Sequence, residues 1–341
     1  MKIPETLSYD DVLLVPQYSD IRSREECDTS TVIGPGVELK IPIVSSCMDT
    51  VTEAEMAAAL ARAGGLGIIH RYNTPEDQAE LVRSAVVNSG GGPVAAAIGV
   101  TGDYFKRADL LLASGASALC IDVAHGHHIL VKEVLEELRA THGEGLCIIA
   151  GNVATKQGIN DLTDWGANAV RCNIGGGSIC STRIQTGHGV PGLETILQCY
   201  QTDRNVAIIA DGGLRNSGDI VKAIAAGADC VMLGSLLSGT DETPGDFVYV
   251  NGEKRKAYRG MASPEAQFDW RGRAGSLEGV SATVPYKGSA DLILTNLMQG
   301  LRSGMSYSGA RTLKELQHRA QFIKQSSAGA TESGTHIHTN R

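Results

Sequence analysis

The feature that most constrains the fold is a series of eight short apolar runs that alternate with amphipathic stretches. Each run holds five to eight residues, is rich in β-branched residues, and has Gly, Asp, Asn, His or Ser at or next to its end. Such runs are typical of strands buried on both faces of a parallel sheet. The runs cover residues 41–46, 66–70, 93–99, 118–123, 146–153, 169–174, 206–213 and 230–235.

The stretches between the runs have the periodicity of helices, as in "TEAEMAAALARAG" and "SGDIVKAIAAGA". Segments such as "SGASALC" and "AGADCV" indicate a helix end followed by a return to the sheet. Eight strand–helix units with right-handed connections predict an α/β fold, the (β/α)8 TIM barrel. The alternative is a doubly wound sheet, which needs a phosphate-binding loop after its first strand. The sequence there, "SSCMDTVTEAE", is not such a loop.

Three segments lie outside this pattern. Residues 1–40 precede the first strand, and residues 242–288 separate the last strand from a helix expected to begin near Ala290. An insertion of that length inside a compact domain is usually functional or disordered, so we interpret 242–288 as a mobile flap. The polar segment 325–341 is predicted to be a disordered tail. Residues 1–324 are thus expected to form a single catalytic domain.

Charge and composition exclude several classes of protein. The net charge of -8 argues against a nucleic-acid partner. Because the chain has no apolar run of 18 residues and its start does not resemble a signal peptide, we expect a cytoplasmic protein without a membrane partner. The eight cysteines include no Cys-x-x-Cys pair, and several lie in apolar runs, which argues against structural zinc. Cys180 differs because it lies among glycines and serines.

In a barrel, the residues that follow the strands form the active site, and the last two strands commonly end in a phosphate site. Here those strands end in a turn with Asp211 and Gly213 and in a turn with Gly234 and Ser235. Glycine turns expose N–H groups to an anion, so we predict a phosphate site, with two ordinary turns as the alternative.

The stretch "GGGSICSTR" contains the second chemical signal. N–H groups in a glycine-rich loop lower the pKa of a thiol, so Cys180 is a candidate nucleophile; a spare loop thiol is the alternative. Thr182 lies close enough in sequence to share a proton with a carboxylate. The carbonyls of such a loop also suit a monovalent cation.

A cluster of histidines follows the fourth strand in "DVAHGHH", which contains Asp122, His125, His127 and His128. Its spacing does not match a helical pair of metal ligands, so we do not predict a metal there. Asp122 is expected to accept hydrogen bonds from a sugar or an amide.

Together, several longer segments resemble the IMP dehydrogenase / GMP reductase family. They are "SYDDVLLVPQYSDIRSR", "MDTVTEAEMAAALARAGGLGIIHR", "AGNVAT", "GGGSICSTRIQTGHGVP", "IADGGLRNSGDIVKAIAAGADCVMLGSLLSG", "YRGMAS" and "EGVSATVPYKG". The resemblance spans roughly residues 7–323. It implies a (β/α)8 barrel, a homotetramer, a purine nucleotide as substrate, and a cysteine that attacks C2 of the purine.

The resemblance also implies a role for individual residues. Cys180 would be the nucleophile, with Thr182 and Glu278 handling protons. Asp122, Asn152 and Arg183 would lie near the nicotinamide of the cofactor, and the carbonyls of Gly175, Gly177 and Cys180 would hold potassium. The nucleotide would be bound by Ser178, Asp211, Gly213, Gly234, Ser235, Tyr258, Gly260 and Met261.

Two features favour GMP reductase, which deaminates GMP to IMP with NADPH. The segment "HRYNTPEDQAELVRSAVVNSGGGPVAAAIG" leaves no room for the CBS regulatory domain that most dehydrogenases carry. The flap also lacks the Arg-Tyr pair with which the dehydrogenases activate water. The alternative is an IMP dehydrogenase without CBS domains, which oxidises IMP to XMP with NAD and uses Arg271 or Arg273.

Other features leave further alternatives open. The segment around "TVTEAEMAAALARAGGLGIIHR" is closer to the dehydrogenases, and Asn173 and Arg71 replace the family's usual glycine and lysine. A nucleotide sensor without activity would not need Cys180, Thr182 and Glu278 together. A barrel that binds flavin would be coloured.

Overall fold

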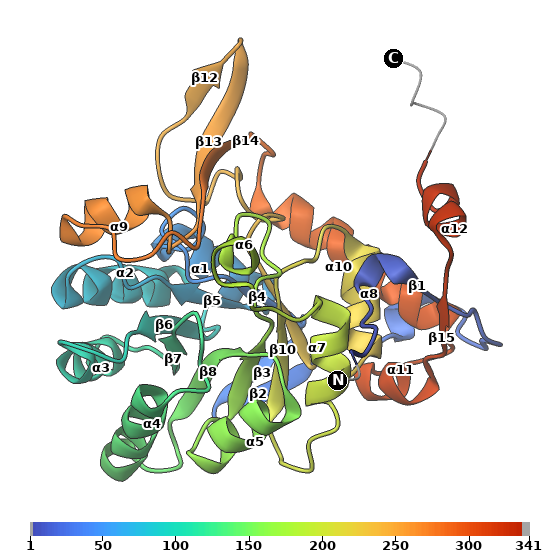
Figure 1. Cartoon of the computed structure of the whole chain (residues 1–341), viewed down its shortest axis with the longest axis horizontal. Helices are drawn as coiled ribbons and strands as arrows, with labels where there is room; N and C mark the ends of the chain where they lie inside the picture. The colour runs from blue at the N-terminus through green and yellow to red at the C-terminus, as the bar shows by residue number, and fades with distance from the viewer. Residues whose placement is uncertain (1–2, 336–341) are drawn as a thin grey trace.

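The computed structural model describes residues 3–335, and its centre is a closed barrel of eight parallel strands (Figure 1). The strands follow one another in chain order around the barrel, and the last, β11, pairs with the first, β4. Each predicted apolar run contains one of them, which confirms the predicted (β/α)8 barrel. The strands are β4 (Ile43–Ser45), β5 (Leu66–Ile69), β6 (Val94–Ile98), β7 (Ala118–Asp122), β8 (Cys147–Val153), β9 (Ala169–Cys172), β10 (Ala207–Asp211) and β11 (Cys230–Leu233).

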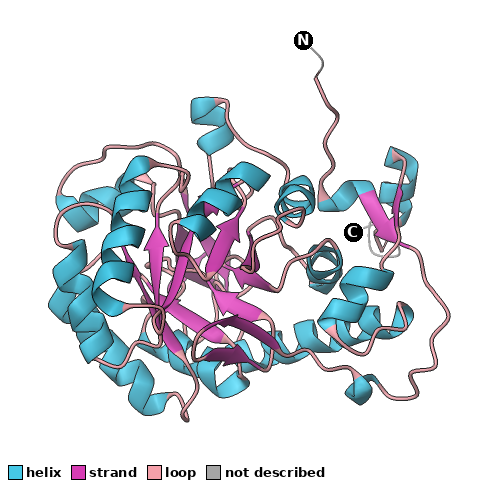
Figure 2. Cartoon of the chain, turned by 90° about the horizontal axis from the view of Figure 1, so that it is seen from below, coloured by secondary structure: helices cyan, strands magenta, loops and turns pink. Residues whose placement is uncertain are grey.

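Helices surround the strands, as a view from below shows (Figure 2). Only α2 lies between β5 and β6, so the described chain has no regulatory domain inserted there. Helix α10 begins at Ala290, where the sequence predicted it. The helices of the barrel are α1 (Ala54–Ala63), α2 (Pro75–Asn88), α3 (Tyr104–Ala113), α4 (Ile129–His142), α5 (Lys156–Asp164), α6 (Thr182–Thr186), α7 (Gly192–Cys199), α8 (Ser217–Ala225), α10 (Ala290–Tyr307) and α11 (Leu313–Arg319).

A hairpin closes the N-terminal end of the barrel. It consists of β2 (Thr31–Gly34) and β3 (Val37–Leu39), and its apolar side chains belong to the same buried cluster as the side chains inside the barrel. Gly34 lies against the first residue of β8, because a Cβ there would be 2.6 Å from Sγ of Cys147. With this end closed, the space open to a ligand lies at the opposite end, where the strands finish.

Two segments from opposite ends of the described residues pair beside the barrel. Strand β1 (Val12–Leu14) follows the short helix η1 (Tyr9–Asp11) and pairs antiparallel with β15 (Phe322–Lys324), and η2 (Arg24–Glu26) leads toward the hairpin. Part of the segment predicted to be disordered is ordered, because Ser327–Glu332 form α12, whose first turn is capped by the Ser326 side chain. The rest of that prediction, residues 336–341, lies outside the described residues.

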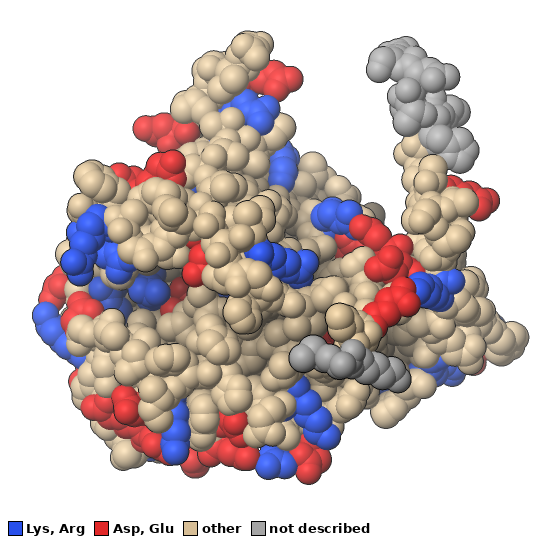
Figure 3. Space-filling view, in the orientation of Figure 1, with Lys and Arg blue, Asp and Glu red and all other residues tan. Residues whose placement is uncertain are grey.

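The flap has its own small sheet, which rises from the barrel in Figure 1. Strands β12 (Val248–Val250), β13 (Glu253–Arg259) and β14 (Ser281–Pro285) pair antiparallel, and α9 (Pro264–Arg271) lies between β13 and β14. Acidic and basic side chains are mixed over the face seen in Figure 3. No helix among residues 3–335 is long and apolar enough to cross a membrane.

Candidate active site

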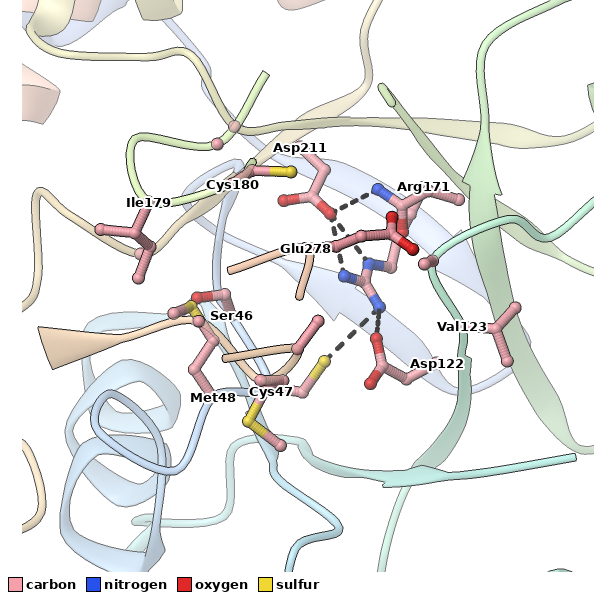
Figure 4. Close-up of a pocket in the computed structure, with 18 of the residues that line it drawn as sticks. Ser46, Cys47, Met48, Asp122, Val123, Arg171, Ile179, Cys180, Asp211 and Glu278 are labelled. Atoms are coloured by element: carbon pink, nitrogen blue, oxygen red, sulfur yellow. Dashed lines mark hydrogen bonds and ion pairs between the residues drawn. The ribbon is translucent and has the colours of Figure 1, made fainter. Parts of the chain in front are cut away.

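A cavity of about 530 Å³ opens where the barrel strands end, beneath the flap. Its walls contain every residue to which the resemblance gives a role except Arg183. From the barrel these are Asp122, Asn152, Gly175, Gly177, Ser178, Cys180, Thr182, Asp211, Gly213, Gly234 and Ser235, and from the flap Tyr258, Gly260, Met261 and Glu278. Residues from most of the chain's length thus meet in one place (Figure 4).

A chain of hydrogen bonds links Cys180 to a carboxylate of the flap. The Cys180 thiol donates to Oγ1 of Thr182 at 3.2 Å, and that hydroxyl donates to Oε2 of Glu278 at 2.8 Å. Of the eight cysteines, Cys180 alone is not buried. The arrangement gives a thiol that reaches the cavity a route for its proton, which is what nucleophilic catalysis by cysteine requires.

The flap brings Glu278 to this position by pairing with the cysteine loop. The N–H of Ser181 donates to the carbonyl of Glu278, and the N–H of Val280 donates to the carbonyl of Ile179, each at 3.0 Å. Cys180 and Gly279 therefore face each other in an antiparallel bridge. Gly279 has no room for a side chain, since a Cβ would be 2.9 Å from the N atom of Ser263.

Hydroxyl groups and glycine turns gather at the end of the cavity beside β10 and β11. The hydroxyls of Ser178 and Tyr258 lie 3.3 Å apart. Gly234 lies against them, because a Cβ there would be 3.1 Å from the hydroxyl oxygen of Tyr258. Hydroxyls and exposed N–H groups suit a phosphate, so the geometry is compatible with the predicted phosphate site.

The floor of the cavity contains Arg171, a residue that the sequence analysis missed. Its guanidinium donates to Oδ1 of Asp122 at 2.6 Å and to Oδ2 of Asp211 at 2.9 Å (Figure 4). Burial alone would raise the pKa of Asp122, but Arg171 and then Arg71 lower it, and the net pKa lies below its usual value. Asp122 is therefore held as a carboxylate.

Asn152 orients the second of these carboxylates. Its Nδ2 donates to Oδ2 of Asp211 at 2.7 Å and to the carbonyl of Asn173 at 3.1 Å. With Arg171 on the same oxygen, one carboxylate oxygen of Asp211 is fully engaged. The other, Oδ1, has no hydrogen bond from any residue between 3 and 335 and is available to a ligand.

Arg183 lies away from the cavity. Its guanidinium donates to the carbonyl of Val190 at 2.7 Å. Its stem packs against two glycines, because a Cβ on Gly175 or Gly189 would lie 2.5 or 2.6 Å from Cγ of Arg183. In this conformation Arg183 supports the glycine loop and does not line the cavity.

The flap also contacts the barrel through aromatic rings. Tyr72, which follows β5, stacks on Trp270 of α9 with 4.1 Å between ring centroids, and the Arg71 guanidinium lies 5.4 Å from the Trp270 ring centroid. The Tyr72 hydroxyl donates to the carbonyl of Met261 at 2.7 Å. Arg271 lines the cavity, whereas Arg273 does not.

The expected potassium ligands belong to one bent loop. Gly175 has a left-handed φ of 80°, and the N–H of Cys180 donates to the carbonyl of Gly177 at 3.1 Å. A carbonyl oxygen has two lone pairs, so Gly177 keeps one for a cation. Carbonyl oxygens are suitable ligands for a hard monovalent cation.

The histidine cluster after β7 forms a local contact. His127 lies 2.7 Å from the carboxylate of Asp161.

Comparisons with known proteins agree on one family. A sequence model of the IMP dehydrogenase / GMP reductase domain matches residues 6–336. An inosine-5'-monophosphate dehydrogenase of Nitrosopumilus maritimus is 35% identical, with 98% of this chain and 99% of the relative covered. A GMP reductase of Leishmania donovani is 33% identical, with 98% and 97% covered.

The solved structures include a similar GMP reductase. A cysteine-to-alanine variant of the Trypanosoma brucei enzyme, in complex with guanosine 5'-monophosphate, superposes with a TM-score of 0.93 at 33% identity, and 98% of each chain is covered. The sequence alignments extend over 473 and 478 residues, more than the 341 residues of this chain, so both relatives contain segments that this chain lacks.

Proposed function

The chain belongs to the IMP dehydrogenase / GMP reductase family, and from that premise we propose that it is a GMP reductase. The reaction would convert GMP, NADPH and two protons into IMP, NADP⁺ and ammonium. The proposal is supported above all by the flap, where Arg271 lacks a neighbouring tyrosine and its Nη2 is bound to Oε1 of Gln267 at 2.5 Å. A reductase must protect its covalent intermediate from water, and this flap lacks the pair that activates water in the dehydrogenases.

In the first half of the reaction, Cys180 would replace the amino group at C2 of GMP. Addition of the thiol across the C2–N3 double bond forms the S–C2 bond and leaves the thiol proton on the purine ring or on a nearby acceptor. Transfer of a proton to the 2-amino group then lets ammonia leave as the C2–N3 double bond is restored. We assign the transfer of this proton to Thr182 and Glu278, because among the described residues they form the only hydrogen-bonded path from the Cys180 thiol.

The second half requires a hydride at C2, which NADPH supplies when it is bound. The residues present suit a cofactor beside the nucleotide, since the cavity continues past Asp122 to Arg71 and to Val100 and Thr101 after β6. Asp122 and Asn152 present polar groups to this part of the cavity. Once C2 carries the hydride, the S–C2 bond breaks, the thiolate regains a proton through Thr182, and IMP is free.

Potassium would have a structural role in this scheme. The carbonyls of Gly175, Gly177 and Cys180 would hold the ion, and its charge would fix the loop that presents the Cys180 thiol.

IMP dehydrogenase is the second candidate, and one observation favours it. Arg271 lines the cavity, so a change in its contact with Gln267 would bring a guanidinium to a water molecule beside the adduct. In that reaction Cys180 attacks C2 of IMP, hydride leaves to NAD⁺, and water releases XMP.

Product analysis distinguishes the two reactions. We expect the protein to form one IMP and one ammonium for each NADPH consumed with GMP, and to form no XMP from IMP and NAD⁺. Formation of NADH and XMP from IMP, with loss of that activity in Arg271→Ala, would establish the dehydrogenase instead.

A further inference from the structure

Lys287 links the end of the flap to the turn that follows β11. Its ammonium donates to the carbonyls of Ser235 at 2.5 Å and Leu236 at 3.3 Å. The backbone N–H of Lys287 donates to the carbonyl of Gly239 at 2.9 Å. The side chain is partly buried and does not line the cavity, whereas Ser235 does.

The contacts of Lys287 fix the direction of a peptide group in this turn. The N–H groups of Leu237 and Ser238 both donate to the carbonyl of Gly234, so residues 234–238 form one helical turn. A trans peptide is planar, and its C=O and N–H point in opposite directions. Because the Ser235 carbonyl points at the ammonium, the N–H of Leu236 points away from it.

The ammonium of Lys287 has no anionic partner in the described part of the chain. None of the ion pairs there includes Lys287, and burial lowers its pKa. Removing a cation from water without a counter-charge is unfavourable. The turn separates this charge from the end of the cavity that carries the hydroxyls of Ser178 and Tyr258.

We propose that Lys287 is a positioning residue for the 5'-phosphate of the nucleotide. It holds the 234–238 turn from behind and places a positive charge there, and the phosphate is the missing anion. Lys287 therefore discriminates a nucleotide from the unphosphorylated nucleoside without touching either. The inference rests on the proposed function only in requiring a purine nucleotide, and IMP serves it as well as GMP.

The test compares two ligands that differ only in the phosphate. Dissociation constants for GMP and inhibition constants for guanosine are measured for the wild type, Lys287→Gln, Lys287→Met and Lys287→Arg. The Gln side chain keeps a hydrogen-bond donor but has no charge. This variant therefore separates the hydrogen bond that holds the turn from the positive charge that acts on the phosphate. Lys254→Met is the matched control, because the Lys254 ammonium lies over the Phe247 and Tyr286 rings of the same flap.

We expect Lys287→Gln and Lys287→Met to weaken GMP binding about tenfold or more while guanosine changes less than about twofold, a loss of roughly 1.4 kcal/mol specific to the phosphate. Lys287→Arg should stay near the wild type, and Lys254→Met should change neither ligand. Equal weakening of GMP and guanosine binding, or unchanged GMP binding, would overturn the proposed role of Lys287 and leave the proposed function standing. A wild type that binds neither GMP nor IMP would overturn the proposed function and this inference with it.

Discussion

The hydroxyl of Thr182 lies 2.8 Å from the carboxylate of Glu278, although 96 positions separate the two residues in the chain. The flap segment that carries Glu278 is paired to the cysteine loop by backbone hydrogen bonds, so the proton path exists only while the flap is closed on the barrel.

Removing the carboxylate should therefore stop proton transfer and leave substrate binding almost intact. We expect Glu278→Gln to lower kcat about 100-fold to 10,000-fold, the range of general acid–base catalysis, with KM changed much less. Steady-state kinetics measure both constants. Glu265→Gln is the control, since Glu265 is a flap carboxylate that bonds the Ser281 hydroxyl at 2.8 Å and should not affect kcat. An equal loss in both variants would contradict the assignment.

Replacing the nucleophile separates binding from chemistry. Cys180→Ala removes the S–C2 bond and little else, because the Cys180 thiol makes one hydrogen bond to Thr182. The variant should bind GMP with an affinity close to that of the wild type, as calorimetry would show, and should form no IMP. Residual turnover above about one thousandth of the wild-type rate would mean that another group attacks C2.

Arg171 should matter to stability in a way that depends on pH. Arg171→Met leaves Asp211 without its cation and leaves Asp122 with Arg71 alone, and breaking a buried ion pair costs about 3–5 kcal/mol. The pKa of Asp122 is lowered in the folded protein, so the stability it contributes is complete above its unfolded pKa of about 3.9 and is lost as pH falls through the folded value.

In the variant the pKa of Asp122 should rise, because Arg71 alone then opposes the effect of burial. We expect the melting temperature of Arg171→Met to be well below that of the wild type at neutral pH, and the difference to narrow as pH falls toward 4, where the Asp122 carboxylate of the variant binds a proton. Thermal unfolding across this pH range measures the effect. If the difference in melting temperature did not change with pH, the loss of stability would come from packing rather than from charge.

The stack of Tyr72 on Trp270 should hold the flap closed. Trp270→Ala removes a contact worth about 0.5–1.5 kcal/mol beyond the buried area, so the flap should open more often. We expect faster proteolytic cleavage within residues 242–288 and a higher KM for the nucleotide. Phe268→Ala changes an exposed ring of the same helix and should leave both unaffected. Unchanged cleavage in Trp270→Ala would contradict the role of the stack.

The barrel could be predicted from the sequence because its strands are local signals. Each apolar run, from 41–46 to 230–235, contains one strand, and residues at or just after the end of each strand line the cavity. Glycine-rich turns such as Asp211–Gly213 could be assigned to the site because they directly follow a predicted strand.

Features that depend on distant pairing could not be predicted in this way. Nothing near Val12 indicates that β1 pairs with β15, and Tyr72 and Trp270 lie in separate segments. Arg171 was missed because it stands inside an apolar run, although a charged residue in a strand buried on both faces is itself a signal of a buried ion pair. The resemblance gave Arg183 a place near the nicotinamide, and only the structure shows that its stem fills the space beside Gly175 and Gly189.

The most direct test of the account follows one hydrogen atom. GMP is incubated with the protein and NADPH that carries deuterium at the transferable position of its nicotinamide, and the product is analysed by mass spectrometry and NMR. Reduction at a C2 freed of its amino group predicts IMP with one deuterium at C2, released with an equal amount of ammonium, and no product from Cys180→Ala. Absence of deuterium from C2, or formation of XMP and NADH from IMP in its place, would contradict the account.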